Sequence, residues 1–221
     1  MTYSAVLFDL DGTLCTNSQS VEAIYDGAFE TTGIEPFGDP EDLWAALDDP
    51  PAPDDEAGYL AAGFAKVAAQ YGRAPVDVVA LGRGFLQCAD HSQVSPRAGA
   101  ERVLEAAQDV PLGVVTNGPK ARQAEKLEAL PFDDLFEAVV FAGDLERRKP
   151  HAEPFERALS AIEAVPSETL FVGNSLEYDV AGAQNAGLPA AWCPVEPEPP
   201  EPYRPDHVLE SLTDLEEVLG L

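Results

Sequence analysis

Basic residues are scarce in this 221-residue chain. Lys and Arg together number 13, against 40 Asp and Glu, which gives a formal net charge of −27. The chain contains no basic stretch that could neutralise a row of phosphates, so we expect it to bind neither nucleic acid nor an anionic membrane. An acidic composition with so few lysines resembles that of proteins from salt-accumulating halophiles, because screening by salt relieves the self-repulsion of such a surface.

Cysteine and long apolar segments are also in short supply. The three cysteines, Cys15, Cys88 and Cys193, are widely spaced. They match neither a zinc-binding spacing nor a disulfide framework, which favours a reducing, cytoplasmic location. The apolar runs are far shorter than the roughly 20 residues that a membrane-spanning helix needs. Residues 1–10 lack the basic start and the cleavage site of a signal peptide, so we expect none.

Hydrophobic residues make up 45% of the chain, which is enough for a substantial core. Strand-like and helix-like patterns alternate from residue 99 onward, and one further apolar strand begins the chain. Strands are expected at 4–9, 112–115, 138–141, 169–172, 190–192 and 208–209. Helices are expected at 99–107, 121–130, 153–161, 179–186 and 212–219. This alternation predicts an α/β fold with a doubly wound parallel sheet.

The block between residues 16 and 92 has helical periodicity and no convincing strand. Ser20 and Gly33 provide the start and stop signals of its first helix. We therefore predict a catalytic core made of residues 1–15 and 93–221, with an α-helical domain, residues 16–92, inserted after the first strand.

Polar side chains follow the carboxyl ends of four predicted strands, where ligands of parallel sheets bind. The four sets, in chain order, are Asp9-x-Asp11-Gly12-Thr13, Thr116-Asn117-Gly118, Lys149-Pro150, and Gly173-Asn174-Ser175 with Asp179. Each motif alone has a plain structural interpretation, such as an Asn-Gly turn, a basic surface cluster or a helix cap. Their predicted convergence on one crevice is the stronger signal.

These motifs, in this order, resemble those of the haloacid dehalogenase superfamily, in particular its aspartate-nucleophile phosphatases of the phosphoglycolate phosphatase-like type. The likeness extends over essentially the whole chain. It implies a Rossmann-like core with a helical cap at residues 16–92. It further implies a Mg²⁺-dependent hydrolase that acts on small phosphorylated metabolites.

The resemblance also implies a role for each motif. Asp9 would attack phosphorus and form an aspartyl-phosphate, while Asp11 would protonate the leaving alcohol and later deprotonate water. The Asp9 carboxylate must then stay ionised while the neighbouring Asp11 holds a proton. Thr116 and the amides of Asn117 and Gly118 would bind the phosphoryl oxygens. Lys149 would balance their charge.

The magnesium ligands implied by the resemblance are the Asp9 carboxylate, the Asp11 main-chain carbonyl and an acidic residue after the fourth strand. This chain departs from the family there, because Asn174 stands where an aspartate is usual. An amide oxygen can bind Mg²⁺ but carries no charge, so we expect weaker metal binding. We expect Asp179 to take part in the metal site, either as a partial direct ligand or by contacting the direct ligands.

Other functions on the same fold stay open. A haloacid dehalogenase needs no metal and lacks the second aspartate, so Asp11 argues against it. A phosphomutase differs through cap residues that carry no readable motif. Asn174 leaves room for a non-catalytic interaction protein. The sequence predicts neither the substrate nor the oligomeric state.

Overall fold

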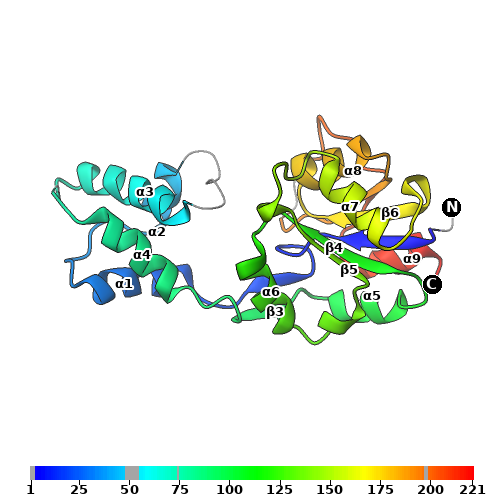
Figure 1. The fold of residues 1–221 in the computed structure, drawn as a ribbon, viewed down its shortest axis with the longest axis horizontal. Coiled ribbons are helices and arrows are strands. Elements are labelled where there is room, and N and C mark those ends of the chain that lie inside the picture. Colours follow the sequence, from blue (N-terminus) through cyan, green and yellow to red (C-terminus); the bar gives the residue numbers. More distant parts are fainter. Residues whose placement is uncertain (1–2, 48–54, 74, 197–198) are drawn as a thin grey trace. The chain divides into compact units, whose positions relative to one another are not determined.

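The computed structural model divides the chain into two compact units (Figure 1). Residues 1–16 and 94–221 form the core unit, and residues 17–93 form the helical unit. The structure describes residues 3–47, 55–73, 75–196 and 199–221.

The core unit is built on a six-stranded sheet of order β5-β4-β1-β6-β7-β8, in which every neighbouring pair is parallel. The strands are β1 (Ala5–Phe8), β4 (Leu112–Thr116), β5 (Ala138–Phe141), β6 (Thr169–Gly173), β7 (Ala190–Trp192) and β8 (His207–Val208). From β1 the chain builds outward to β4 and β5 on one side, and then to β6, β7 and β8 on the other. The point where the strand order reverses therefore lies beside β1. The doubly wound α/β fold predicted from the sequence is confirmed.

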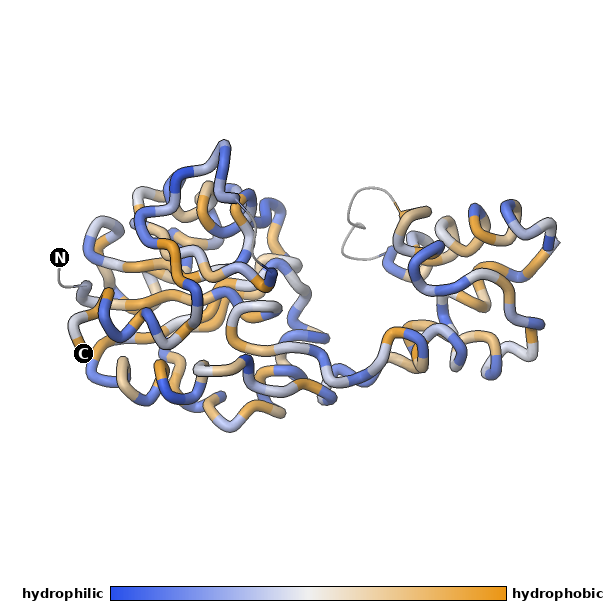
Figure 2. The backbone as a smooth tube through the Cα atoms, turned by 180° about the vertical axis from the view of Figure 1, so that it is seen from behind, coloured by the Kyte–Doolittle hydropathy of each residue, from blue (hydrophilic) through white to orange (hydrophobic). Residues whose placement is uncertain are grey.

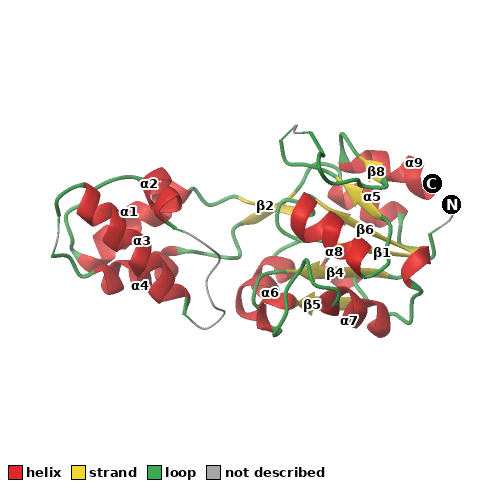
Figure 3. Cartoon of the chain, turned by 90° about the horizontal axis from the view of Figure 1, so that it is seen from above, coloured by secondary structure: helices red, strands yellow, loops and turns green. Residues whose placement is uncertain are grey.

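Helices cover both faces of this sheet (Figure 3). They are α5 (Ala100–Ala106), α6 (Lys120–Glu128), α7 (Glu153–Ala161), α8 (Gly182–Asn185) and α9 (Leu215–Leu219). Short helical turns lie at η1 (Asp133–Leu135), η2 (Ala142–Asp144), η3 (Pro166–Glu168) and η5 (Leu212–Asp214). None of the helices in the described part of the chain is both long and apolar enough to span a bilayer.

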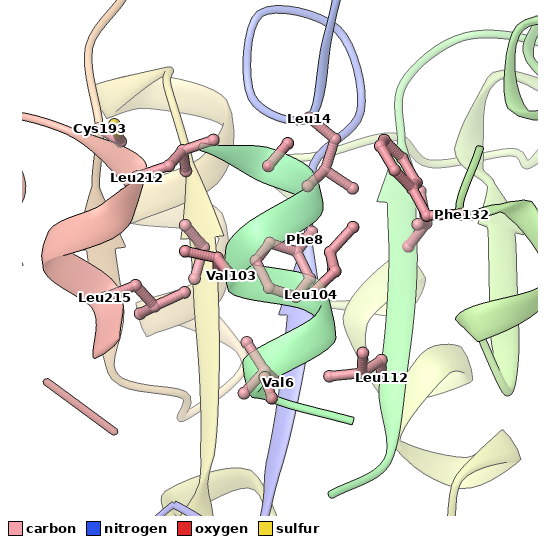
Figure 4. Packing of buried hydrophobic residues seen from close by; sticks show 14 of the residues in the cluster. Val6, Phe8, Leu14, Val103, Leu104, Leu112, Phe132, Cys193, Leu212 and Leu215 are labelled. Carbon is pink, nitrogen blue, oxygen red and sulfur yellow. The ribbon is translucent and has the colours of Figure 1, made fainter. Parts of the chain in front are cut away.

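Strand β1 contributes to two hydrophobic clusters because its side chains alternate between the faces of the sheet. Val6 and Phe8 pack in the cluster that includes Leu104 of α5 (Figure 4). Leu7 packs on the opposite face with Phe155 of α7. All four residues of β1 are buried, so the strand is apolar throughout, and it holds the polar residues that follow it in a fixed place.

The helical unit has a hydrophobic core of its own, and Figure 2 shows apolar and polar residues alternating along its helices. These are α1 (Val21–Thr32), α2 (Pro40–Ala46), α3 (Glu56–Gln70) and α4 (Val78–Cys88). As predicted, Ser20 caps the start of α1, and Gly33 ends it with φ of +68°. The rings of Tyr25, Phe29 and Phe64 pack at centroid distances of 5.1 to 5.9 Å.

Two short strands that the sequence pattern does not predict lie where the chain passes between the two units. Strands β2 (Cys15–Asn17) and β3 (Val94–Pro96) pair in a separate two-stranded sheet. The Ser18 N–H donates to the Gln93 carbonyl at 2.8 Å, just beyond their ends. Segments of three residues are too short to show a two-residue periodicity, which is why the pattern did not reveal them.

The helix expected at 179–186 begins earlier and is not uniform. A π-helical segment, η4 (Leu176–Ala181), comes first, and α8 follows it. The Ser175 carbonyl accepts from the N–H groups of both Asp179 and Val180 at 3.1 Å, so the first turn is wider than an α-helical turn. Such segments are rare and often lie at functional sites.

Candidate active site

A buried lysine joins two buried aspartates at the carboxyl edge of the sheet. The Lys149 Nζ lies 2.7 Å from Asp9 Oδ1 and 2.7 Å from Asp179 Oδ1. The exposed fractions of the three side chains are 2% for Lys149, 10% for Asp9 and 2% for Asp179. One ammonium group therefore stands between two carboxyl groups with little water around them.

The pKa values of this triad reflect an excess of acidic groups. Burial raises the pKa of Asp9 to about 7, because the lowering effect of Lys149 is offset by Asp179 and Asp11. Burial lowers the pKa of Lys149, but Asp179 and Asp9 outweigh it and the pKa ends above its ordinary value. Lys149 thus stays protonated, whereas Asp9, expected to be the ionised aspartate, needs further positive charge to be fully ionised at neutral pH.

Thr13 brings Asp9 and Asn174 together. Its Oγ1 lies 3.2 Å from Asp9 Oδ2 and 3.1 Å from Asn174 Oδ1, yet a hydroxyl has only one proton to donate. Oxygen acceptors therefore outnumber donors at this point. The loop can approach Asn174 because residue 12 is glycine with φ of +77°; a Cβ there would lie 2.9 Å from Asn174 Nδ2.

Asp179 is turned toward Lys149 by the π-helical segment. Its Oδ1 accepts from Lys149, and its Oδ2 accepts from the Ser175 N–H at 2.9 Å. The carboxyl group folds back over Gly173, where a Cβ would lie 2.4 Å from Asp179 Cγ. Both oxygens of Asp179 are therefore bonded to donors of the chain itself, and this geometry favours a role in holding Lys149.

Asn117 fastens the segment that carries Lys149. Its Oδ1 accepts from the Lys149 N–H at 2.9 Å, and its Nδ2 donates to the Lys149 carbonyl at 3.0 Å. The Asn117 side chain thus joins the end of β4 to the Lys149 main chain in both directions. The adjacent Gly118 N–H donates to the Thr116 hydroxyl at 3.3 Å.

Asp11 is bound by two residues of α6 that the sequence analysis did not identify. Lys126 Nζ lies 2.6 Å from Asp11 Oδ1, and Gln123 Nε2 donates to Asp11 Oδ2 at 2.6 Å. The sequence does contain a signal that could have identified Gln123. Gln123 falls on the same helical stripe as Leu127 and Leu130, which are buried, and a polar residue on such a stripe needs a partner.

Arg97 was also missed. Its guanidinium donates to the carbonyls of Gly12 at 2.7 Å and Cys193 at 2.9 Å, and to that of Pro194. It ties the loop after β1 to the chain after β7. Nothing in the sequence distinguished this arginine from a surface residue.

The oxygen atoms near Asp9 fit a hard cation such as Mg²⁺. Within residues 3–47, 55–73, 75–196 and 199–221, no group of three or more His, Cys, Asp or Glu side chains could hold a metal ion. The available ligands are of another kind, namely the Asp9 carboxylate and the neutral amide oxygen of Asn174, both of which contact Thr13 Oγ1. The acceptors crowded around Thr13 and the raised pKa of Asp9 both indicate a local need for positive charge.

All four strand-end motifs enter one network of contacts. Thr13 joins Asp9 to Asn174. Lys149 joins Asp9 to Asp179. Gln123 adds the second motif, because its Nε2 bonds both Asp11 and, at 3.0 Å, the buried Thr116 hydroxyl.

Comparisons with known proteins agree on one family. A family model described as haloacid dehalogenase-like hydrolase matches residues 3–187. Pyrophosphatase PpaX of Bacillus mycoides is 30% identical over 238 residues, which cover 100% of this chain and 98% of the relative. PpaX of Bacillus thuringiensis strain Al Hakam is 30% identical over 240 residues, with the same coverage.

Solved structures share the fold over the full length. The hydrolase YfnB of Bacillus subtilis, solved with magnesium, matches with a TM-score of 0.78 and 24% identity, covering 100% of both chains. CbbY of Rhodobacter sphaeroides, solved with phosphate, matches with a TM-score of 0.69 and 20% identity, also covering 100% of both.

Proposed function

The chain belongs to the haloacid dehalogenase-like hydrolase family, and on this premise we propose that it is a Mg²⁺-dependent phosphatase of small phosphorylated metabolites. The observation that carries the proposal is the buried triad of Asp9, Lys149 and Asp179 at the carboxyl edge of the sheet. It pairs a carboxylate able to attack phosphorus with a fixed positive charge able to bind a phosphoryl oxygen.

The proposed reaction has two displacements at phosphorus. In the first, an Asp9 carboxylate oxygen forms a bond to phosphorus while the P–O bond to the alcohol breaks, and Asp11 gives its proton to the departing oxygen. In the second, water attacks phosphorus and transfers a proton to Asp11, and the bond to Asp9 breaks. Inorganic phosphate leaves, and both aspartates return to their starting states.

The phosphoryl group would be bound by Thr116, by the main-chain N–H of Asn117 and by Lys149. The Gly118 N–H, also expected to bind it, donates to the Thr116 hydroxyl at 3.3 Å and would act through that hydroxyl. Lys149 is suited to binding the phosphoryl group because Asn117 fixes its main chain and Asp179 fixes its ammonium group. Asp179 would thus act on the substrate through Lys149.

Asp9, Asn174 and the Asp11 carbonyl would hold Mg²⁺. When bound, the ion would neutralise part of the negative charge of the phosphoryl group and of Asp9. The shortage of donors around Thr13 and the raised pKa of Asp9 support this placement.

The helical unit, residues 17–93, is proposed as the cap that selects the substrate. We also propose a cytoplasmic location, because Cys15, Cys88 and Cys193 are all free thiols.

The test is phosphate release from 4-nitrophenyl phosphate in molar KCl, with added Mg²⁺ and with a chelator. We expect release with Mg²⁺ and its loss with the chelator. Metal-independent halide release from a 2-haloacid would instead identify a dehalogenase. Transfer of phosphate within a sugar phosphate would identify a phosphomutase. Inactivity on a broad panel would favour a non-catalytic interaction protein.

Inorganic pyrophosphate is a second candidate substrate. Relatives named pyrophosphatase PpaX match this chain over its whole length at 30% identity. Pyrophosphate presents the same kind of phosphoryl group to Asp9, with phosphate as the leaving group. Pyrophosphate is therefore included in the substrate panel. The kcat/KM values for pyrophosphate and for the phosphate esters show which of the two is the preferred substrate.

Replacing Asn174 by aspartate should tighten metal binding. The substitution adds a negative charge to the proposed ligand set, so the Mg²⁺ concentration for half-maximal activity should fall by about 10-fold or more. A Mg²⁺ titration of activity measures the effect. Gln108→Glu adds the same charge at an exposed position after α5 and serves as the control. Equal Mg²⁺ requirements in the wild type and Asn174→Asp would remove Asn174 from the proposed ligands.

We also propose that the protein is adapted to concentrated salt, on the basis of its net charge of −27. The Debye length falls from about 10 Å at 0.1 M to about 3 Å at 1 M salt, so KCl should relieve repulsion across the surface. A gain of about 3 kcal/mol in the free energy of unfolding between low and high KCl corresponds to a rise of about 6–12 °C in Tm for a chain of this size. Thermal unfolding at 0.1 M and 3 M KCl measures it, and an unchanged Tm would contradict the adaptation.

A further inference from the structure

Two side chains of α6 bind Asp11 at both of its oxygens. Lys126 and Gln123 lie three residues apart, on the same face of the helix, and each donates to one oxygen at 2.6 Å. The Lys126 side chain is 11% exposed and the Asp11 side chain is 44% exposed, and Gln123 as a whole residue is 3% exposed. A partly exposed carboxylate is therefore fixed in place by two donors from the interior.

The Gln123 amide also determines how the Thr116 hydroxyl is used. Gln123 Nε2 has two protons, and it donates to both Asp11 Oδ2 and Thr116 Oγ1. Thr116 Oγ1 accepts a second hydrogen bond from the Gly118 N–H. Both lone pairs of the hydroxyl are then occupied, which leaves its one proton for an acceptor outside this network. A phosphoryl oxygen is such an acceptor.

The oxygen of the Gln123 amide, Oε1, shows that the amide is held in one orientation by its contacts with Asp11 and Thr116. Among the described residues, Gln123 Oε1 is the buried side-chain polar atom without a hydrogen-bond partner. An unsatisfied buried carbonyl costs free energy. Turning the amide over would place Oε1 against the Asp11 carboxylate, since the two groups lie 2.6 Å apart. The chain leaves one acceptor unpaired while Nε2 serves both Asp11 and Thr116.

We propose that Gln123 and Lys126 are positioning residues of the hydrolytic reaction: they hold Asp11 for proton transfer, and Gln123 fixes the Thr116 hydroxyl as a donor to the phosphoryl group. The inference rests on the proposed function. When Asp11 gives its proton to the leaving oxygen, the two donors stabilise the carboxylate that results. When water attacks the aspartyl-phosphate, the same carboxylate takes a proton from it.

The test compares two leaving groups. Phenyl phosphate and 4-nitrophenyl phosphate have similar shapes, but phenolate needs a proton as it leaves and nitrophenolate hardly does. In Lys126→Met, kcat/KM for phenyl phosphate should fall by about 30-fold or more, and that for 4-nitrophenyl phosphate by about 3-fold. Lys126→Arg should recover most of the loss. Lys120→Met removes the same charge from an exposed position on α6 and should stay close to the wild type.

Gln123→Met provides an independent measurement. It should show the same dependence on the leaving group, because Asp11 loses one donor. It should also weaken inhibition by inorganic phosphate by about 10-fold, because the Thr116 hydroxyl is no longer directed outward. Circular dichroism and thermal unfolding check that each variant is folded. If Lys126→Met does not fold, the dependence of Gln123→Met and Lys126→Arg on the leaving group tests the inference.

Equal losses on both aryl phosphates, or losses no larger than those of Lys120→Met, would overturn the inference while the proposed function stands. A wild-type protein that releases phosphate from neither compound with Mg²⁺ would overturn the proposed function, and the inference with it.

Discussion

Replacing Asp9 by asparagine should lower kcat for phosphate release by about 10⁴-fold or more, the scale of loss found when a catalytic nucleophile is removed. An amide cannot form the acyl-phosphate bond. The change is nearly isosteric, so the new amide can keep the contact with Thr13, whose Oγ1 lies 3.2 Å from the present Oδ2. It also removes a buried group whose pKa is raised to about 7, which should leave the fold intact.

Two measurements separate this outcome from a general loss of structure. Acid-quenched wild type should carry a phosphoryl group on Asp9 during turnover, detectable by mass spectrometry, and Asp9→Asn should carry none. Asp134→Asn makes the same change at an exposed position and should retain full activity. Residual activity within 10-fold of the wild type would show that Asp9 is not the nucleophile.

Replacing Lys149 by methionine should reduce both activity and stability. Asp9 and Asp179 would lose the ammonium group that each contacts at 2.7 Å, and two buried carboxyl groups would face each other without a counter-charge. Breaking a buried ion pair in this way costs about 3–5 kcal/mol in the free energy of unfolding. The phosphoryl group would also lose a fixed charge, which should cost about 10²–10³-fold in kcat/KM.

Chemical denaturation with and without Mg²⁺ measures the stability change. Added Mg²⁺ should restore part of the stability of Lys149→Met, because a divalent cation at the proposed site gives the Asp9 carboxylate another counter-charge. Lys120→Met, at an exposed position, should unfold like the wild type. A Lys149→Met protein that keeps both the wild-type unfolding free energy and the wild-type kcat/KM would contradict the role given to the triad.

The strands and most helices could be predicted because their signals are local. A strand that is buried on both faces, such as Ala5–Phe8, appears in the sequence as consecutive apolar residues. The caps Ser20 and Gly33 bound α1 as expected. Polar residues placed after successive strands were enough to locate the network at the sheet edge, because parallel strands bring their carboxyl ends together.

What the sequence did not reveal depends on contacts between distant segments. Lys126 meets Asp11 across 115 residues, and Arg97 meets Cys193 across 96. No periodicity encodes such pairs. The π-helical start of η4 depends on a single carbonyl, that of Ser175, accepting two N–H groups. The raised pKa of Asp9 could not be predicted from the sequence for a related reason: the burial that raises it is a property of the folded core.

The pairing of β2 with β3 has a consequence for how this chain can change over generations. The Ser18 N–H and the Gln93 carbonyl are hydrogen-bonded, so the stretch between them leaves and rejoins the core at neighbouring points. A gene segment that encodes a different module could replace it, longer or shorter, without stretching either junction. The residues of the proposed active site would stay unchanged, while the new module could favour a different substrate.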